Sequence, residues 1–467
     1  MPTRTETDSL GPIAVPSDAL YGAQTVRAIH NFPISGLRAH PALICAIAMV
    51  KMAAAGANRS LALIPIDLAD AIIAAAQEIA AGQHHKQFPV DVFQAGAGVS
   101  FHMNANEVIA NRANQILGAP LGSYARVHPN DHVNYGQSTN DVFPTAMRLA
   151  ALLALTDLYL VLDTLATTFA AKADEFHGIM KSGRTHLQDA TPLRLGQEFA
   201  AYGVAIAKSR EALSAAAATL CELGLGGSAV GTGINTHPDY RARAVANLAA
   251  ISGEPLTPAP DMRYAMQSCA PMANISAALR GLALEVIRIA NDLRLLSSGP
   301  NTGLAEINLP ALQPGSSIMP GKINPVIPEL AAMVGFQVVG NDTAVALAVQ
   351  AGQLELNVMM PVMASNVLQS ITILTATLQQ LDESCVRGIT ANRARCEQYA
   401  QSTVSLATAL NPYIGYAKAA EIVKESIATG ESIIAIARRK NLLTEQQIAE
   451  ILDPVRMTEP QIPLEKG

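Results

Sequence analysis

The hydrophobic residues of this chain recur with the spacing of helices rather than of strands. The clearest set alternates spacings of four and three residues over three heptads, which is typical of helices packed in a bundle. Its members are Ile275, Leu279, Leu282, Val286, Ile289, Leu293 and Leu296. A second helix is indicated by apolar residues with small alanines between them: Phe199, Tyr202, Ile206, Leu213 and Leu220. A third is expected from about Glu329 to Leu347, and because strand-like alternation is scarce, the pattern favours a largely helical chain.

Four polar segments rich in glycine interrupt the predicted helices. They span residues 96–107, 130–141, 182–192 and 315–325. Loops on a rigid scaffold often hold the functional residues of a protein, so these segments are the first candidates for a site. From about Arg395 the pattern predicts a smaller helical unit, in which Thr444 and Gln447 match a capping box.

The composition indicates a large buried interior. The 467 residues are 50% hydrophobic and only 15% charged, with a net charge of −6 from 32 basic and 38 acidic residues. This balance argues against a nucleic-acid partner, and so apolar a chain is not intrinsically disordered. Because an exposed monomer surface normally needs more charge, we expect part of the apolar surface to lie between subunits.

The sequence favours a cytoplasmic protein. Its five scattered cysteines have neither C-x-x-C nor zinc-finger spacing, which fits a reducing compartment. The first residues, MPTRTETDSLG, lack the apolar core of a signal peptide. The most membrane-like stretch, Leu149 to Ala171, contains Asp157 and Asp163, which are costly in lipid. We interpret it as a central helix of a soluble assembly and expect no membrane partner.

The segment GSSIMPGKINPVIPE, residues 315–329, has the composition of an anion-binding loop. Its glycines allow sharp bends that expose backbone N–H groups. Ser316 and Ser317 add hydroxyls, while Lys322 adds a positive charge and Asn324 an amide. These groups suit a dicarboxylate, although the same composition also fits an ordinary flexible loop before a helix.

At this segment the chain resembles the aspartase/fumarase superfamily. GSSIMPGKIN matches every fixed position of the family signature G-S-S-x-M-P-x-K-x-N. The other three polar segments match family segments in the expected order, and the resemblance extends over essentially the whole chain. It implies an all-α, three-domain fold with a long central helix bundle, divided as residues 1–139, 140–394 and 395–467. It also implies a homotetramer whose active sites each draw on three subunits.

The resemblance further implies a reaction that removes H–X across a carbon–carbon bond and leaves fumarate. The proton lies α to a carboxylate and has very low acidity, so the site must stabilise the doubly charged aci-carboxylate formed on its removal. By resemblance, Ser316 is the general base and acts as an oxyanion. Backbone N–H groups of the loop and the charge of Lys322 would have to lower the pKa of its hydroxyl.

The resemblance assigns further residues to catalysis and substrate binding. His186 is implied to contact the substrate and Glu329 to hydrogen-bond His186, which would favour the charged imidazole. Taken alone, His186 is better explained as a structural histidine in a cap or core, and the surrounding match to the family reverses that preference. The substrate contacts implied are Val99, Ser100, Ser138, Thr139, Asn140, Thr185, Ser317, Met319, Lys322 and Asn324.

The segment NYGQSTND allows two interpretations that are compatible with each other. The hydroxyls of Ser138 and Thr139 and the amide of Asn140 suit a carboxylate and an amino group. The same residue types are strongly preferred at a helix N-cap, and a helix N-terminus itself favours anion binding.

The segment GAGVSFHMN departs from the pattern of the family's ammonia-lyases. Their G-x-G-T-S-x-x-M-N places a threonine hydroxyl on the β-carboxylate, where this chain has Val99. Losing a hydrogen bond to a charged group costs about 1.5–3 kcal/mol, which corresponds to about tenfold or more in affinity. The alternatives are that water fills in or that another group replaces the β-carboxylate; Ser100 is retained. His102 is interpreted as a structural neighbour.

Two branches of the family are the main candidates, with aspartate ammonia-lyase favoured over class II fumarate hydratase. Four segments resemble the ammonia-lyases: QFPVDVFQAGAG, VNYGQSTND, NPVIPELAAMVGFQVVGNDT and AGQLELNVMMPV. GRTHLQDATPL and GGSAVGTGIN resemble either branch. Val99 keeps open a third interpretation, a lyase for a substituted or altered aspartate.

A non-catalytic helical scaffold is the alternative from another class of protein. It is disfavoured because Ser316, His186, Lys322 and Asn324 are all present. No His/Cys/carboxylate cluster has metal-ligand spacing, so no metal or organic cofactor is expected, and the expected partners are a small dicarboxylate and further copies of the chain.

Overall fold

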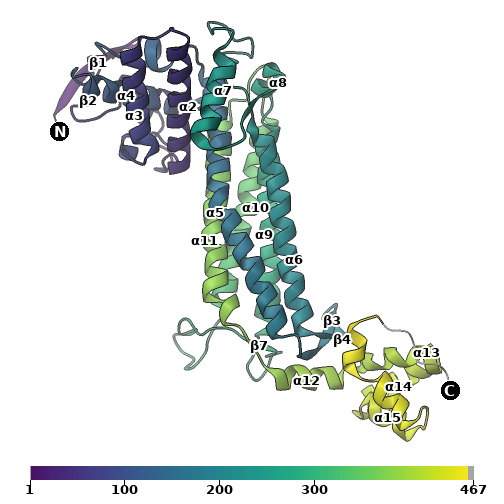
Figure 1. Cartoon of the computed structure of the whole chain (residues 1–467). Coiled ribbons are helices and arrows are strands. Elements are labelled where there is room, and N and C mark those ends of the chain that lie inside the picture. The colour runs from purple at the N-terminus through teal and green to yellow at the C-terminus, as the bar shows by residue number, and fades with distance from the viewer. Residues whose placement is uncertain (1, 461–467) are drawn as a thin grey trace. The chain divides into compact units, whose positions relative to one another are not determined.

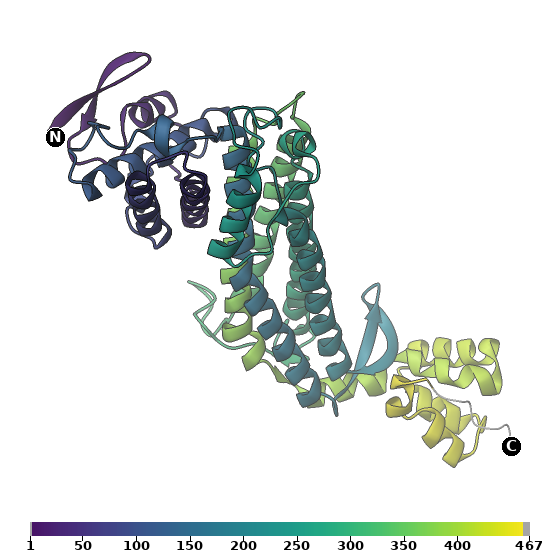
Figure 2. The same cartoon turned by 45° about the horizontal axis from the view of Figure 1, so that its top comes forward.

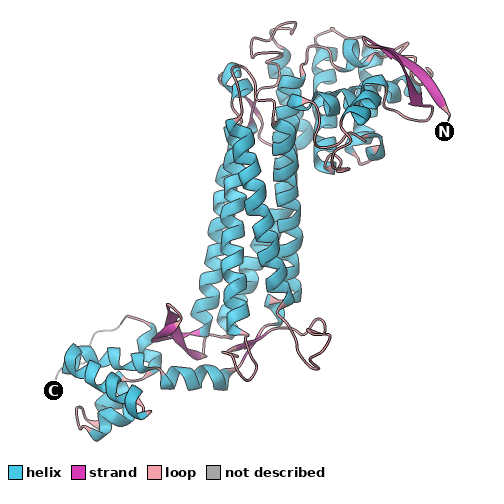
Figure 3. Cartoon of the chain, turned by 180° about the vertical axis from the view of Figure 1, so that it is seen from behind, coloured by secondary structure: helices cyan, strands magenta, loops and turns pink. Residues whose placement is uncertain are grey.

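The computed structural model describes residues 2–460, and helices dominate it (Figures 1 and 3). The predicted all-α fold is therefore confirmed. The remaining residues, 1 and 461–467, belong to the outer ends of the first and third predicted domains and lie outside the described part. The chain folds into two compact units, and the division between them falls within its longest helices.

The first half of the chain begins with a small hairpin and continues with helices. The strands are β1 (Thr3–Asp8) and β2 (Gly11–Pro16), which pair antiparallel, and β3 (Met180–Thr185) and β4 (Gln188–Arg194), which form a second antiparallel hairpin. The helices are α1 (Ala23–Asn31), α2 (Pro41–Ser60), α3 (Ile66–Ala80), α4 (Val99–Ile116), α5 (Thr139–Glu175) and α6 (Leu195–Ala218).

The second half contains three more long helices and a set of short ones. The strands are β5 (Glu222–Leu223), β6 (Thr257–Pro258), β7 (Ile307–Asn308) and β8 (Thr390–Ala391). The longer helices are α7 (Tyr240–Ser252), α9 (Ala270–Leu296), α10 (Val326–Gln350), α11 (Met360–Ser384), α12 (Arg393–Ser402) and α14 (Tyr416–Thr429). The short ones are α8 (Met262–Gln267), α13 (Asn411–Ile414), α15 (Ile433–Arg439) and α16 (Glu445–Ile451).

The first unit contains the described residues up to Leu160, together with 209–283 and 334–375. In it α2 packs against α3 and α7, and α3 packs against α4; α2 and α3 run side by side in Figures 1 and 2. Fully buried alanines of α2, such as Ala46, Ala53 and Ala57, permit this close approach because small side chains at a contact shorten the distance between helix axes.

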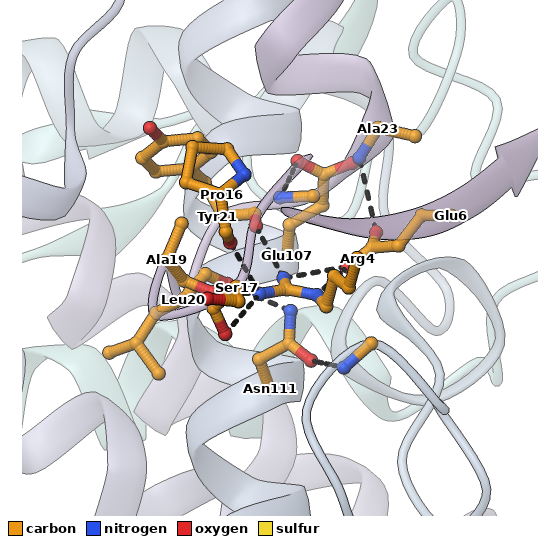
Figure 4. Close-up of polar contacts among 12 residues, drawn as sticks. Arg4, Glu6, Pro16, Ser17, Ala19, Leu20, Tyr21, Ala23, Glu107 and Asn111 are labelled. Atoms are coloured by element: carbon orange, nitrogen blue, oxygen red, sulfur yellow. Dashed lines mark hydrogen bonds and ion pairs between the residues drawn. The ribbon is translucent and has the colours of Figure 1, made fainter. Parts of the chain in front are cut away.

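Buried carboxylates hold the N-terminal hairpin and the start of α1 in the first unit (Figure 4). Glu107 of α4 accepts hydrogen bonds from the Thr25 hydroxyl at 2.6 Å and from the backbone N–H groups of Gly22, Gln24 and Thr25. These donors are N–H groups at a helix start, which the helix itself leaves unsatisfied. Arg4 pairs with Glu6 at 2.7 Å and donates to the carbonyls of Pro16, Ser17, Ala19 and Tyr21.

The second unit contains residues 161–208, 284–333 and the described residues from Ala376 onward. It includes the β3–β4 hairpin, the loop before α10 and the C-terminal helices. The C-terminal helices enclose a small core that includes Leu406, Leu410, Ile422, Ile436 and Ile448. The predicted small helical unit from about Arg395 thus has its own hydrophobic cluster, and the predicted capping box of Thr444 and Gln447 is present.

The helices predicted from spacing match the structure. All seven residues of the heptad repeat from Ile275 to Leu296 are buried in α9, and the five residues from Phe199 to Leu220 are buried as well. Helix α10 covers the predicted helix of residues 329–347. The predicted domain boundaries lie next to the starts of α5 and α12, whereas the two compact units divide the chain at other positions, so the three-domain division remains a prediction.

Four helical stretches are long and apolar enough to cross a bilayer, judged by length and composition only. They are Pro41–Ser60, Thr139–Glu175, Val326–Gln350 and Met360–Gly388. In the most apolar windows of the first two, 67% and 44% of the residues are buried within the protein. Polar residues also lie buried in these helices, among them Lys51, Asp141 and Asn341. The interpretation as soluble packing helices remains a prediction.

Candidate active site

The starts of α4 and α5 meet in the first unit, and both come from predicted polar segments. Val99 is the first residue of α4 and Thr139 the first of α5. Gly98, just before α4, has φ +83°, and a Cβ atom there would overlap the Phe143 ring of α5. Phe101 and Phe143 also pack edge to face at 6.1 Å. Glycine at 98 therefore permits both the turn and the close approach of the two helices.

Ser138 caps the N-terminus of α5, as one of the two interpretations of this segment predicts. Its hydroxyl accepts a hydrogen bond from Asn140 N at 3.2 Å, and its own N–H donates to the Asp141 carboxylate at 2.9 Å. This reciprocal pattern satisfies groups that the first turn leaves unpaired. The cap leaves the positive end of the helix dipole at Thr139 and Asn140, which favours an anion there.

Asp141 ties the start of α5 to the segment 226–229. Its carboxylate also accepts from the backbone N–H groups of Gly226 at 3.0 Å and Ser228 at 3.1 Å. Burial raises the pKa of Asp141 to about 6, although these hydrogen bonds act in the opposite direction. Beside it, the Asn140 side-chain N–H donates to the Ala229 carbonyl at 2.9 Å. The amide orientation of Asn140 is thereby fixed, and its carbonyl oxygen is left as the acceptor.

A buried polar chain that sequence reasoning missed reaches Thr139 from α2. Lys51 Nζ lies 2.7 Å from His102 Nε2, and His102 Nδ1 lies 2.7 Å from the Thr139 hydroxyl. Lys51 and His102 are both fully buried, and Thr139 is 9% exposed. The available signal was a lysine in the otherwise apolar stretch 41–57, but its partners lie 51 or more positions away in sequence. His102 is buried, as expected for a structural neighbour.

In the second unit, the loop before α10 places two backbone donors on Ser316. The Ser316 hydroxyl oxygen accepts from Met319 N at 2.9 Å and from Ile318 N at 3.2 Å. Two N–H groups aimed at one oxygen stabilise negative charge on it and so favour ionisation of the hydroxyl. Ser316, Met319 and Lys322 line an open pocket of about 480 Å³.

The two glycines of this loop serve different geometric needs. A Cβ atom on Gly315 would lie 2.7 Å from the Lys322 carbonyl and 2.9 Å from Asn324 N, so the chain can cross itself only with glycine there. Gly321 has φ +78° and open space around it. The Asn324 side chain closes the loop by donating to the Gly315 carbonyl at 2.8 Å, while Lys322 and Ser317 remain exposed.

Thr185 and His186 lie at the tip of a β-hairpin, where the sequence predicted only a polar loop. β3 ends at Thr185, β4 begins at Gln188, and the two-residue turn consists of His186 and Leu187 with φ of 55° and 59°. Positive φ at both positions is the pattern of a type I′ turn, which normally uses asparagine or glycine. A histidine and a leucine are strained there, and such strain tends to cluster at functional sites.

Buried ion pairs anchor this hairpin within the second unit. Glu306 is fully buried and pairs with Lys181 at 3.1 Å and with Arg184 at 2.9 Å, and both cations belong to β3. Lys181 also pairs with Glu198 of α6 at 2.7 Å. Removing one member of a buried pair leaves an uncompensated charge. The network therefore fixes the strand that leads directly into Thr185 and His186.

Replacing Leu187 by asparagine should stabilise the hairpin. Asparagine adopts positive φ at lower cost than leucine, whose left-handed conformation costs about 1–2 kcal/mol. The matched control is Leu187→Val, because a β-branched residue is worse at positive φ. Thermal unfolding should rank the asparagine variant above wild type and the valine variant below it. The reverse order would show that contacts of the exposed leucine outweigh the backbone strain.

Each unit brings part of the predicted site together. In the first unit these residues are Val99, Ser100, Ser138, Thr139 and Asn140. In the second unit the loop collects Ser316, Ser317, Met319, Lys322 and Asn324. Among the described residues no hydrogen bond joins His186 to Glu329, a half-buried residue in the first turn of α10. The predicted pairing of His186 with Glu329 and the individual substrate contacts remain predictions.

Within residues 2–460, no group of three or more His, Cys, Asp or Glu side chains is placed to hold a metal ion. The expectation of a cofactor-free reaction rests on the sequence and stays a prediction.

Comparison with known proteins links this geometry to a family of lyases. Residues 11–340 match the family model described as Lyase, and residues 406–459 match the model described as Fumarase C C-terminus. The chain is 49% identical over 463 residues to an aspartate ammonia-lyase from Pseudomonas aeruginosa, with 98% of each chain covered. It is 51% identical over 456 residues to a class II fumarate hydratase from Halobacterium salinarum, with 97% of each chain covered.

Solved structures of fumarate lyases and fumarases also resemble this chain. A fumarate lyase:delta crystallin from Brucella melitensis bound to cobalt matches with a TM-score of 0.95 at 48% identity, covering 98% of this chain and 100% of that chain. A class II fumarase from Schistosoma mansoni matches with a TM-score of 0.95 at 36% identity, covering 98% and 99%. Ammonia-lyases and hydratases therefore occur at similar overall identity, so their distinction depends on local features.

Proposed function

We propose that this chain, which belongs to the aspartase/fumarase superfamily, is an aspartate ammonia-lyase that converts L-aspartate reversibly into fumarate and ammonia. The observation that carries the choice of leaving group is the fixed amide of Asn140. Because its N–H is held by the Ala229 carbonyl, its oxygen is the end able to accept from the substrate. An ammonium group offers three hydrogen-bond donors to such an oxygen, whereas the hydroxyl of malate offers one.

In the proposed reaction, Ser316 as an alkoxide removes a proton from the carbon next to the one bearing the amine. The electron pair of the C–H bond moves into the neighbouring carboxylate and gives an aci-carboxylate dianion. That pair then forms the carbon–carbon double bond as the C–N bond breaks and ammonia leaves. Met319 and Ile318 N–H groups support the alkoxide before proton transfer, and Lys322 and Asn324 are proposed to hold the α-carboxylate.

The sequence segments near the site support the same choice. QFPVDVFQAGAG, VNYGQSTND and NPVIPELAAMVG resemble the ammonia-lyase branch. The first leads directly into α4, and the other two contain the starts of α5 and α10. The runner-up is fumarate hydratase, favoured by the 51% identity to the Halobacterium salinarum enzyme and by segments that fit both branches. A lyase for a substituted aspartate is the third candidate, because Val99 is 42% exposed and offers no donor.

Direct assay separates the three candidates. The purified protein is supplied with L-aspartate, L-malate and a panel of N-substituted aspartates, and fumarate formation is followed by its absorbance. We expect kcat/KM to be highest for L-aspartate. A higher value for L-malate would assign the chain to the hydratases, and a higher value for an N-substituted aspartate would assign it to the third class.

Introducing a hydroxyl at position 99 should tighten aspartate binding. Val99→Thr restores a donor of nearly the same shape, and one hydrogen bond to a carboxylate corresponds to about a tenfold lower KM. Val99→Ala is the matched control, because it changes the shape without adding a donor. An unchanged KM in the threonine variant would show that the β-carboxylate does not lie at this position.

A homotetramer with shared sites is part of the proposal. On α10 an exposed apolar stripe includes Met333, Phe336 and Leu347, which are 60%, 63% and 65% exposed, and Gly340 between them has open space above it. So much exposed apolar surface on one helix indicates an interaction surface. We propose that further copies of the chain cover it and complete the site.

A further inference from the structure

The Lys51 ammonium is surrounded by three hydrogen-bonding atoms in the interior of the first unit. Its Nζ lies 3.0 Å from Asn134 Oδ1, 2.8 Å from Gln137 Oε1 and 2.7 Å from His102 Nε2. Lys51 is fully buried, and burial lowers its pKa well below the usual value while the Asp141 carboxylate opposes that shift. A buried lysine with this many partners has a fixed geometry and needs a physical explanation.

The two amide groups cannot turn their N–H ends toward Lys51. Asn134 Nδ2 donates to the Gln137 carbonyl at 3.2 Å, and Gln137 Nε2 donates to the Val133 carbonyl at 3.0 Å. Backbone carbonyls only accept, so the side-chain oxygens of Asn134 and Gln137 must face the lysine. Lys51 therefore uses two of its N–H bonds on them. In its ammonium form, which the nearby Asp141 carboxylate favours, Lys51 has one N–H bond left for His102.

This third N–H bond determines the tautomer of His102. If Nε2 accepts from Lys51, the ring carries its proton on Nδ1, because a neutral imidazole has one donor and one acceptor nitrogen. Burial and the positive charge of Lys51 both lower the pKa of His102 well below its usual value, which keeps the ring neutral. Nδ1–H then donates to the Thr139 hydroxyl oxygen at 2.7 Å, and the hydroxyl proton of Thr139 points to another partner.

We propose that Lys51 and His102 are positioning residues that fix Thr139 as a hydrogen-bond donor to a carboxylate oxygen of the substrate. This inference rests on the proposed function, since it deepens the role of a residue in that site. The hydrogen bonds run from Lys51 through His102 to Thr139, so the Thr139 O–H at the start of α5 donates away from His102. Thr139 thus supplies a donor at the start of α5, whose first turns pack against the start of α4, where Val99 provides none. Asn140 supplies the acceptor for the amine.

Two amide substitutions of His102 test the direction of the hydrogen bonds from Lys51 through His102 to Thr139. In His102→Asn the amide reaches the place of Nδ1 and keeps a donor for Thr139, whereas in His102→Gln it reaches the place of Nε2 and serves Lys51 only. We expect KM for L-aspartate within about threefold of wild type for the asparagine variant and about tenfold higher for the glutamine variant, with kcat changed less than KM. Equal KM values for the two variants would overturn the proposal.

A double-mutant cycle shows whether His102 acts through Thr139. Thr139→Val removes the hydroxyl at nearly constant volume, and in that background His102→Gln should raise KM by less than about twofold. A loss as large as in the wild-type background would show an independent structural role and overturn the proposal. Thermal unfolding and assembled size of each variant are measured alongside, and Thr139→Ser should restore the dependence on His102.

The same assays separate failure of this inference from failure of the proposed function. If wild type forms fumarate from neither L-aspartate nor L-malate, the proposed function is wrong and the inference falls with it. If wild type is active and the effects of His102→Gln and Thr139→Val on KM are additive, the proposed function stands and the positioning role is wrong.

Discussion

Replacing Ser316 with alanine should lower kcat for fumarate formation by about a hundredfold to ten-thousandfold, the usual contribution of a general base. The two N–H groups of Ile318 and Met319 would then face a methyl group, and no oxyanion remains to accept the proton. KM should change little, because the serine is proposed to act on the proton and not to hold a carboxylate. Turnover is followed at the fumarate band with L-aspartate as substrate.

The matched control for this variant is Thr302→Ala, a truncation of an exposed side chain between α9 and β7 that is not among the residues lining the pocket of Ser316. It should keep turnover within about twofold of wild type, since surface substitutions away from a site have small effects. Assembled size and thermal unfolding of both variants should equal those of wild type. Near-normal turnover in Ser316→Ala would remove this serine as the base.

Co-expression of two inactive variants should restore activity if the sites are shared between subunits. Ser316→Ala and Asn140→Ala are each expected to be inactive alone. In a randomly mixed tetramer, a site that takes the two residues from different chains is intact in about a quarter of cases. We therefore expect about a quarter of the wild-type specific activity from the mixture, starting from almost none.

Wild type co-expressed with the chain that carries both substitutions is the matched control. A shared site predicts about a quarter of full activity for this mixture as well. A site built within one chain predicts about one half for the control and no recovery for the two single variants. The pair of mixtures thus tests sharing of the site without requiring a dissociated subunit.

Much of the helical architecture was predictable because its signal is local. Burial of the repeat from Ile275 to Leu296 follows from spacing alone, and the cap of Ser138 and the box at Thr444 follow from residues three positions apart. The β3–β4 hairpin was missed for the converse reason. Its turn residues, His186 and Leu187, have no preference for positive φ, and the pairs that hold β3 to Glu306 join residues far apart in sequence.

The sequence predicted which types of group surround the site residues, but it did not predict which residues supply them or how they are arranged. The motif around Ser316 indicated backbone N–H groups near the hydroxyl, and the structure identifies them as those of Ile318 and Met319. The polar chain behind Thr139 was not predictable, because Lys51, His102 and Gln137 come from three separate segments. No local pattern reports a contact that forms only when distant helices pack.

The two N–H groups that donate to Ser316 come from its own loop, and this affects how related enzymes can acquire new substrate preferences. Both belong to residues within three positions of the serine, whereas the amide of Asn140 is oriented by a separate segment, at Ala229. Substitutions that exchange one departing group for another can therefore accumulate around α5 while the proton-abstracting loop stays unaltered. Laboratory evolution toward other amines or alcohols should find its productive changes there first.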